Sequence, residues 1–402
     1  MNFALFRRTP RHIALAALLV LNSASLLAAV GFEYIGQQII PHGLKFGGTE
    51  VGGLSAIDYD AATNRYFVIS DDRSDTRFYT LQLDLSEFER TDEADMAGVK
   101  IDAVTKIRRR DGALYSKNTA DPEGLRLAPG RKTLFWSDEG KRSFFGFRNP
   151  AITEVSLDGR FVRELPLPEH FKPKGSARGK SAGDAGVYDN LSLESLAVTP
   201  SGKTLWTAAE NGLAQDSVPA DVGQSSLTRL LSFDIASGKA GGEYVYEIEP
   251  VAQSPVLPGL FATNGVSDML AIGERQFIML ERSFAVGAAT PGVKSTGVTI
   301  RLYYADASQA TDVAGMPSIA GRDIRKVAKT LLLDLSQLLT DDATPLSVDN
   351  IEGLTFGPCY KGKPTLILVS DNNFSRRQFT QIVALSVYDP LAMPASRCGK
   401  DD

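Results

Sequence analysis

The feature that most constrains this chain of 402 residues is an internal repeat. A short motif, an acid followed by one further residue and an apolar residue, occurs four times, with a weaker copy near the start. Counted at the residue before the apolar one, the copies stand at positions 53, 124, 195, 269 and 353, so the spacings are 71, 71, 74 and 84. A period of this kind indicates a fold assembled from similar supersecondary units.

Each copy is followed by a short apolar run that ends in an acid: 66–72, 134–139, 205–210, 277–281 and 366–371. The runs are rich in β-branched and aromatic residues, which favours strands over helices. Third strands are expected at 78–84, 151–157, 228–235, 298–305 and 381–388, and fourth strands at 99–107, 161–165, 243–248 and 327–335. The last unit lacks a fourth strand, whereas residues 32–40 form a strand without a unit.

This pattern predicts an all-β protein, a β-propeller of five four-stranded blades in which the N-terminal strand completes the last blade. Six blades are the alternative, if an insertion hides a degenerate unit. Separate β-sandwich domains are a further alternative, but nothing between the units has the composition of a linker. Residues 30–402 are therefore expected to form a single domain.

Residues 1–29 have the pattern of a removable leader. Arg7, Arg8 and Arg11 precede an apolar run from Ile13 to Leu27, and small residues follow it. This order is typical of a signal peptide and predicts a periplasmic or secreted protein without stable membrane insertion after cleavage. The alternative is an uncleaved anchor, although the run is shorter than the ~20 residues that a spanning helix needs.

The two cysteines, Cys359 and Cys398, both lie in the last 44 residues of the chain. Because an exported protein meets an oxidising compartment, a disulfide between them is expected, with a stabilisation of roughly 3–4 kcal/mol on the chain-entropy estimate. Two free thiols are the alternative.

Composition excludes several function classes. The chain has three histidines, one of them in the leader, so a histidine metal cage is nearly excluded. Its formal net charge is −5 and no basic cluster is evident, so nucleic acid is not expected as a partner. There is no G-x-S-x-G nucleophile elbow, which argues against an α/β-hydrolase. We expect a monomer that binds a small anionic ester.

In a propeller, the first strand of each blade starts on the face where the second strand ends. Eleven acids at these positions are therefore expected at one mouth: Asp71, Asp72, Glu123, Asp138, Glu139, Glu194, Glu210, Asp268, Glu281, Glu352 and Asp371. Carboxylates at this density repel one another unless a cation lies among them, and Ca²⁺ takes six to eight oxygen ligands. The alternative is that each acid accepts backbone N–H groups in a turn.

Among these acids, the candidate metal ligands are Asp71, Asp138, Glu210, Asp268, Glu281 and Asp371, with calcium as the expected ion. The candidate catalytic residues are Glu123, Glu194 and Glu352. Three interleaved arginines, Arg126, Arg282 and Arg376, are candidates for binding an anionic substrate, since guanidinium groups suit phosphate and carboxylate. Ordinary salt bridges are the alternative for these arginines.

The sequence resembles the phytase-like family, named for an esterase-like activity of phytase. The resemblance rests on the Glu-Gly-Leu motifs at Glu123 and Glu352, the Ser-Asp strand ends at Asp71 and Asp138, and Asn372 with Asn373 after Asp371. It covers about residues 52–387. The resemblance implies an exported, calcium-dependent propeller that hydrolyses a phosphate or carboxylic ester.

Two functions follow from these patterns. The first is a metal-assisted ester hydrolase. The second is a non-catalytic periplasmic binding scaffold for a metal, an anionic ligand or an envelope protein, because fold alone does not decide between binding and catalysis.

Overall fold

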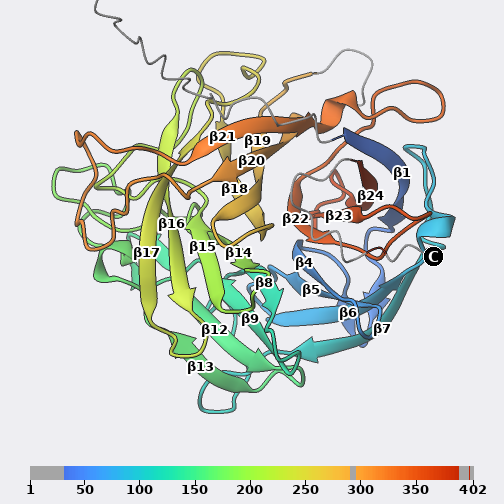
Figure 1. Cartoon of the computed structure of the whole chain (residues 1–402), viewed down its shortest axis with the longest axis horizontal. Helices are drawn as coiled ribbons and strands as arrows, with labels where there is room; N and C mark the ends of the chain where they lie inside the picture. Colours follow the sequence, from blue (N-terminus) through green and yellow to red (C-terminus); the bar gives the residue numbers. More distant parts are fainter. Residues whose placement is uncertain (1–30, 290–295, 389–397, 399–402) are drawn as a thin grey trace, which may run out of the picture.

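The chain folds into five four-stranded antiparallel sheets arranged around a central axis (Figure 1). The computed structural model describes residues 31–289, 296–388 and 398, so the leader predicted at residues 1–29 lies outside the described residues. Within the described ranges, helical structure is limited to three 3₁₀ turns, Leu85–Glu87, Glu169–Phe171 and Leu335–Gln337. No helix among them is long and apolar enough to cross a membrane.

We number the blades in chain order. Blade 1 contains β4 (Leu54–Asp60), β5 (Arg65–Ser70), β6 (Arg77–Leu83) and β7 (Val99–Lys106). Blade 2 contains β8 (Pro122–Leu127), β9 (Thr133–Asp138), β12 (Ala151–Ser156) and β13 (Phe161–Leu165). Blade 3 contains β14 (Leu193–Val198), β15 (Thr204–Ala209), β16 (Ser226–Asp234) and β17 (Ala240–Ile248).

Blade 4 contains β18 (Ala262–Ala271), β19 (Gln276–Ala285), β20 (Val298–Asp306) and β21 (Ala328–Asp334). Blade 5 contains β22 (Ile351–Phe356), β23 (Thr365–Ser370), β24 (Thr380–Tyr388) and, as its outer strand, β1 (Gly31–Ile40). Two short hairpins lie outside the blades: β2 (Lys45–Phe46) with β3 (Thr49–Glu50), and β10 (Lys141–Ser143) with β11 (Gly146–Arg148).

The first strands of the five blades line the central channel. β4, β8, β14, β18 and β22 contact one another in this order, and β22 returns to β4, so the ring is closed (Figure 1). β1 pairs with β24 from Gly31 opposite Tyr388 to Ile40 opposite Thr380. The predicted five-bladed propeller, closed by the N-terminal strand, is confirmed.

The hydrophobic core is divided into clusters between neighbouring blades. The sequence of β23 is apolar without alternation because both faces of its sheet are covered. Leu366 and Leu368 pack with blade 4 residues, whereas Ile367 and Val369 point the opposite way and pack with blade 1 residues. Burying each large apolar side chain in this way stabilises the fold by about 1.5–3 kcal/mol.

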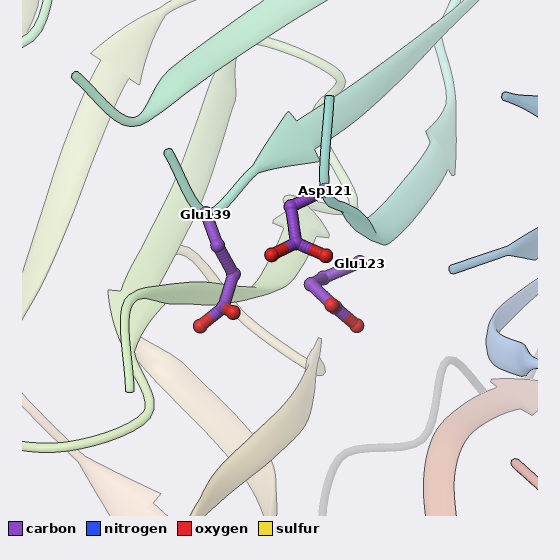
Figure 2. A group of neighbouring side chains, drawn as sticks. All are labelled: Asp121, Glu123 and Glu139. Atoms are coloured by element: carbon purple, nitrogen blue, oxygen red, sulfur yellow. The ribbon is translucent and has the colours of Figure 1, made fainter. Parts of the chain in front are cut away.

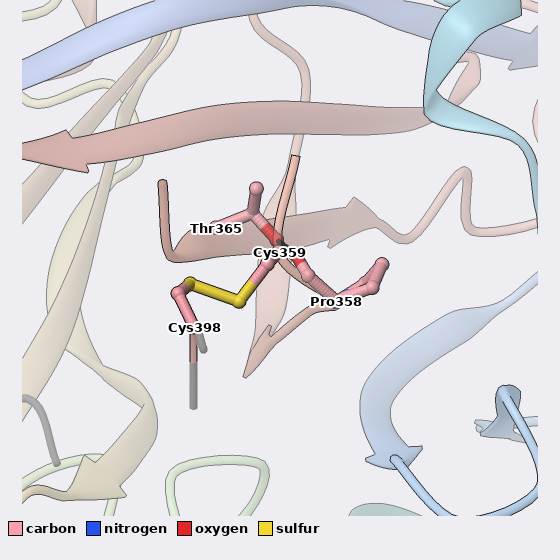
Figure 3. The surroundings of a disulfide bond; sticks show 4 residues. All are labelled: Pro358, Cys359, Thr365 and Cys398. Carbon is pink, nitrogen blue, oxygen red and sulfur yellow. Dashed lines mark hydrogen bonds between the residues drawn. A yellow bond between two sulfur atoms is a disulfide. The ribbon is translucent and has the colours of Figure 1, made fainter. Parts of the chain in front are cut away.

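Cys359 and Cys398 form a disulfide, with their Cα atoms 5.6 Å apart (Figure 3). Cys359 follows Pro358, whose carbonyl accepts a 2.6 Å hydrogen bond from the Thr365 hydroxyl at the start of β23. The bond therefore attaches Cys398 to blade 5, as the sequence predicts.

Candidate functional site

An acid directly follows the second strand of four blades, at equivalent positions. Asp71, Glu139, Glu210 and Asp371 each donate a backbone N–H to a carbonyl just before the first strand of the same blade, over 2.6–3.0 Å. The accepting carbonyls belong to Gly53, Asp121, Ser192 and Asn350. These hydrogen bonds hold the four acids at the same height in the channel mouth.

The first strands supply a second set of acids through a β-bulge. In β14 the pairing with β15 shifts between Leu193 and Ser195, and in β22 the pairing with β23 shifts between Ile351 and Gly353. The residue left unpaired is Glu194 in one strand and Glu352 in the other. A bulge re-aims a side chain out of the regular pleat. β8 has a wider irregularity that contains Glu123.

Three acids of blade 2 form the tightest group. One carboxylate oxygen from each of Asp121, Glu123 and Glu139 lies within 4.8 Å of the others, and all three residues are buried (Figure 2). Asp121 was not among the sequence candidates. It stands two residues before Glu123, and this alternation is the signal that could have identified it.

The strands of blade 4 pair in the same register as those of the other blades, but its acids stand one residue away from the equivalent positions. The bulge in β18 lies between Val266 and Asp268, so Ser267 occupies the position of Glu194 and Glu352. In the same register Glu281 pairs with Val266, as Ala209 pairs with Leu193 in blade 3. Arg282 therefore occupies the position that holds an acid in the other four blades.

This shift removes two candidate metal ligands from the mouth. The carboxylate of Glu281 accepts hydrogen bonds from the Tyr246 hydroxyl and the Lys329 ammonium group, both at 2.8 Å. Asp268 lies deeper in the channel and forms a buried ion pair with Arg126, with 2.7 Å between Nη2 and Oδ2. The expectation that Asp268, Glu281 and Arg126 lie in the mouth is wrong, because a one-residue shift reverses which face a strand residue occupies.

Three further candidates also lie outside the group. Asp72 pairs with Arg77, with 2.6 Å between Oδ2 and Nη1. Asp138 pairs with Arg148 and accepts the backbone N–H of Gly140 at 2.8 Å, so the neighbouring Glu139 takes the place in the mouth. Arg376 is exposed on the loop between β23 and β24. The structure thus gathers eight carboxylates, which we call the acidic mouth: Asp71, Asp121, Glu123, Glu139, Glu194, Glu210, Glu352 and Asp371.

Two arginines lie among these acids. Arg282 Nη2 is 2.9 Å from Glu210 Oε1, and Arg282 Nε is 3.3 Å from Glu352 Oε1. Arg73 pairs with Asp121 and also donates to the Asn190 side chain at 2.6 Å. In the part of the chain that the structure describes, these two arginines are the cations paired with the eight carboxylates, so the acidic mouth carries a strong excess of negative charge when it is ionised.

Burial and mutual repulsion raise the pKa values of these acids. Burial, followed by the charges of Glu352 and Asp121, raises the pKa of Asp71 to about 8. Burial and the charge of Asp121 raise the pKa of Glu139 to about 8. For Glu210, burial raises the pKa to about 7 although Arg282 opposes the shift.

The remaining members shift in the same direction. Burial is the largest cause of the raised pKa of Glu123, Glu194 and Asp371, and the charge of a neighbouring carboxylate is the second cause in each. Without another cation, several of these carboxyl groups hold protons near neutral pH.

The hydrogen-bond pattern tests whether the mouth suits a cation. Asp71 Oδ1 and Glu139 Oε2 are buried oxygen atoms without a hydrogen-bond donor among the described residues. A buried acceptor without a partner costs about 1–3 kcal/mol. Hard cations prefer carboxylate oxygen atoms as ligands, so the donor set fits an ion of the calcium type.

A cavity of about 580 Å³ adjoins the acidic mouth between blades 4 and 5. Glu210, Glu352 and Arg282 form part of its wall, and polar groups of the loop between β23 and β24 form another part. A ligand held in this cavity would therefore contact both the acids and an arginine.

Three solved structures in which the chain follows a similar path have little sequence identity with this protein. An endo-arabinase from Bacteroides thetaiotaomicron is 14% identical, with 85% of this chain and 96% of that chain covered and a TM-score of 0.42. A luciferin-regenerating enzyme is 8% identical, with coverages of 89% and 95% and a TM-score of 0.38. The Dos1 propeller is 6% identical, with coverages of 84% and 69% and a TM-score of 0.33. These values indicate nothing about what this chain acts on.

A comparison with curated proteins gave no match. The model of one family, described as "Phytase-like: Esterase-like activity of phytase", matches residues 49–374. The matched segment includes the whole acidic mouth and most of the chain, so the protein belongs to the phytase-like family.

Proposed function

We propose that this protein is an exported, metal-dependent hydrolase of an anionic phosphate or carboxylic ester, with its active site in the acidic mouth. The observation that carries the proposal is the buried group of eight carboxylates with two unpartnered acceptor atoms, beside a cavity that contains an arginine. Membership of the phytase-like family supports an ester as the substrate.

The residues that would hold the cation are Asp71, Asp121, Glu139, Glu210 and Asp371. When bound, a cation of the calcium type would stabilise negative charge on the ester oxygen atoms and lower the pKa of a water molecule. Neutralising the mutual repulsion of these carboxylates is what the chain gains from the ion.

The catalytic roles fall to Glu123, Glu194 and Glu352. An ionised carboxylate among them accepts a proton from the attacking water, and a protonated one donates a proton to the leaving oxygen. Burial raises the pKa of each of these residues, which favours the protonated form that a general acid requires. Arg282 binds the anionic group of the substrate, and no histidine is required.

Export is part of the proposal. The basic and apolar pattern of residues 1–29 is typical of a signal peptide, and the disulfide between Cys359 and Cys398 suits an oxidising compartment.

The test is neutralisation of Glu123 or Glu352 by Gln. We expect each variant to lose at least about 100-fold in turnover, since general acid–base catalysis contributes 10²–10⁴-fold. The thermal unfolding curve should keep a single cooperative transition. The substrates are phytate, an aryl phosphate and an aryl carboxylic ester, assayed with protein purified without chelator.

The matched control is Glu281→Gln, which changes an equally buried acid outside the acidic mouth. Its turnover should remain near that of the wild type. Unchanged rates in Glu123→Gln and Glu352→Gln would contradict the hydrolase. Bound metal without turnover of any of the three substrates would favour the binding scaffold instead.

A further inference from the structure

The cavity beside the acidic mouth is lined by both charged and aromatic side chains. Glu210, Glu352 and Arg282 are among its charged lining residues, together with Asp349 and Arg377. Phe261, Phe284 and Phe379 also line it and add apolar surface. We call these three residues the phenylalanine wall.

The phenylalanine wall exists because blade 4 is longer than its neighbours at this face. β18 and β19 each have 10 residues, whereas β14, β15, β22 and β23 each have 6. Phe284 stands two residues after Arg282 on β19, so both side chains lie on one face of the strand. The extended strand thus presents first a cation and then an aromatic ring along one line.

The described residues leave part of the phenylalanine wall uncovered. Phe261 is 64% exposed, although its ring lies 6.1 Å from the ring of Phe284. A ligand that covers exposed aromatic area gains about 25 cal/mol of binding free energy for each Å² removed from water. A purely polyanionic ligand would gain nothing from this surface, whereas a ligand with an apolar group would.

We propose that the substrate is amphiphilic, with an anionic ester group at the acidic mouth and Arg282, and an alkyl or aryl group against the phenylalanine wall. This inference rests on the proposed function for the position of the ester. It adds the chemical class of the remainder of the molecule, which the acids alone do not define. Ligand sites of this kind combine an apolar surface with a few orienting polar groups.

The experiment measures binding of alkylphosphonates with two, four, six and eight carbon atoms to the full chain by calorimetry. A parallel series of alkylcarboxylates covers the other anionic head group. Phosphonates have no ester bond, so their binding is independent of turnover. We expect the affinity to increase by about threefold for each added methylene group up to hexyl.

Phe261→Ser and the double variant Phe261→Ser/Phe284→Ser should reduce this increase to less than about 1.5-fold for each methylene. The matched control is Phe145→Ser, because Phe145 is fully exposed at the tip of the β10–β11 hairpin and does not line the cavity. Its series should keep the wild-type dependence on chain length.

A wild-type affinity that does not change with chain length in either series would overturn the inference, as would a dependence that survives in the double variant. If the protein hydrolyses one of the test esters but its affinity for the phosphonates and carboxylates does not change with alkyl chain length, the amphiphilic substrate is refuted and the hydrolase stands. The reverse result, a dependence without turnover, would refute the hydrolase alone.

Discussion

Arg282 changes the character of an otherwise repeated position. Four blades place an acid at the end of the second strand, and blade 4 places Arg282 there. A ring of five acids would only repel an anionic ligand. One arginine places a positive charge on one side of the mouth, where an anion can bind. The anion would lie on the blade 4 side, next to the phenylalanine wall.

When two acids are adjacent, the sequence alone does not predict which side chain points into the channel. Asp138 is the last residue of β9 and Glu139 follows it. In the structure Asp138 accepts the N–H of Gly140 in its own turn, which is the common role of Asp in turns, and also the N–H of Asp121 just before β8. The direction of each side chain depends on the register of the bulged strand, and no residue pattern encoded that register.

The raised pKa values predict how stability depends on pH when a chelator has removed bound metal from the protein. Unfolded Asp and Glu have pKa values of about 4, whereas the pKa of Asp71 and Glu139 is about 8 in the folded chain. The folded state therefore binds more protons than the unfolded state between these values. The free energy of unfolding is highest below about pH 4 with respect to these groups and falls as the pH rises towards about 8.

The measurement is thermal unfolding from pH 5 to 8 with and without chelator. Glu139→Gln should flatten the pH dependence of the chelated protein, and added calcium should restore stability at pH 8. A melting temperature that rises with pH in the chelated wild type would contradict the assigned repulsion.

At the scale of the strand, the repeat predicted most of the architecture. The spacing of the motif and the unpaired strand at 32–40 were sufficient for five blades and their closure, because both depend only on the order of strands. The fourth copy of the motif stands one residue out of place, since Asp268, Met269 and Leu270 match it in sequence, whereas Ser267 holds the equivalent bulge position in the structure. A β-bulge inserts one residue without a sequence marker, so the positions of Asp268 and Glu281 were not predictable.

The motif glycine has a packing reason that leads to a second prediction. A Cβ atom at Gly353 would lie 2.8 Å from Ala56 Cα and 3.0 Å from Ile57 N in the neighbouring first strand. We expect Gly353→Ala to destabilise the protein by about 1–3 kcal/mol, as overpacked core sites do. Urea unfolding measures the change.

Gly130→Ala is the control, because a Cβ atom there would meet nothing within 4 Å. Its effect should stay within about 0.5 kcal/mol. Equal effects of the two substitutions would show that the approach of β22 to β4 does not require glycine.

At the scale of the molecule, Arg126 joins blades across the channel. It donates to the carbonyls of Ile57, Met269 and Leu354 in blades 1, 4 and 5, and forms its ion pair with Asp268 in blade 4. The position of this network below the acidic mouth makes it a cross-brace of the ring rather than part of the site.

Removing one partner of this buried pair should be costly. We expect Arg126→Met to lower the free energy of unfolding by about 3–5 kcal/mol, because it leaves the Asp268 carboxylate uncompensated. The double variant Arg126→Met/Asp268→Asn should lose less than the sum of the two single variants, with a coupling of about 1–3 kcal/mol. Strict additivity in the urea double-mutant cycle would show that the two groups do not stabilise each other.

The pairing of β1 with β24 sets the order of events during folding. Gln37 of β1 bonds with Gln381 of β24, and these residues are 344 positions apart. The strand that is synthesised early must therefore wait, with an exposed edge, until four complete blades and most of the fifth have been made. Closing so long a loop carries a large entropic cost and slows folding. A nascent chain interrupted anywhere before residue 380 can form blades, but it has no way to become a ring.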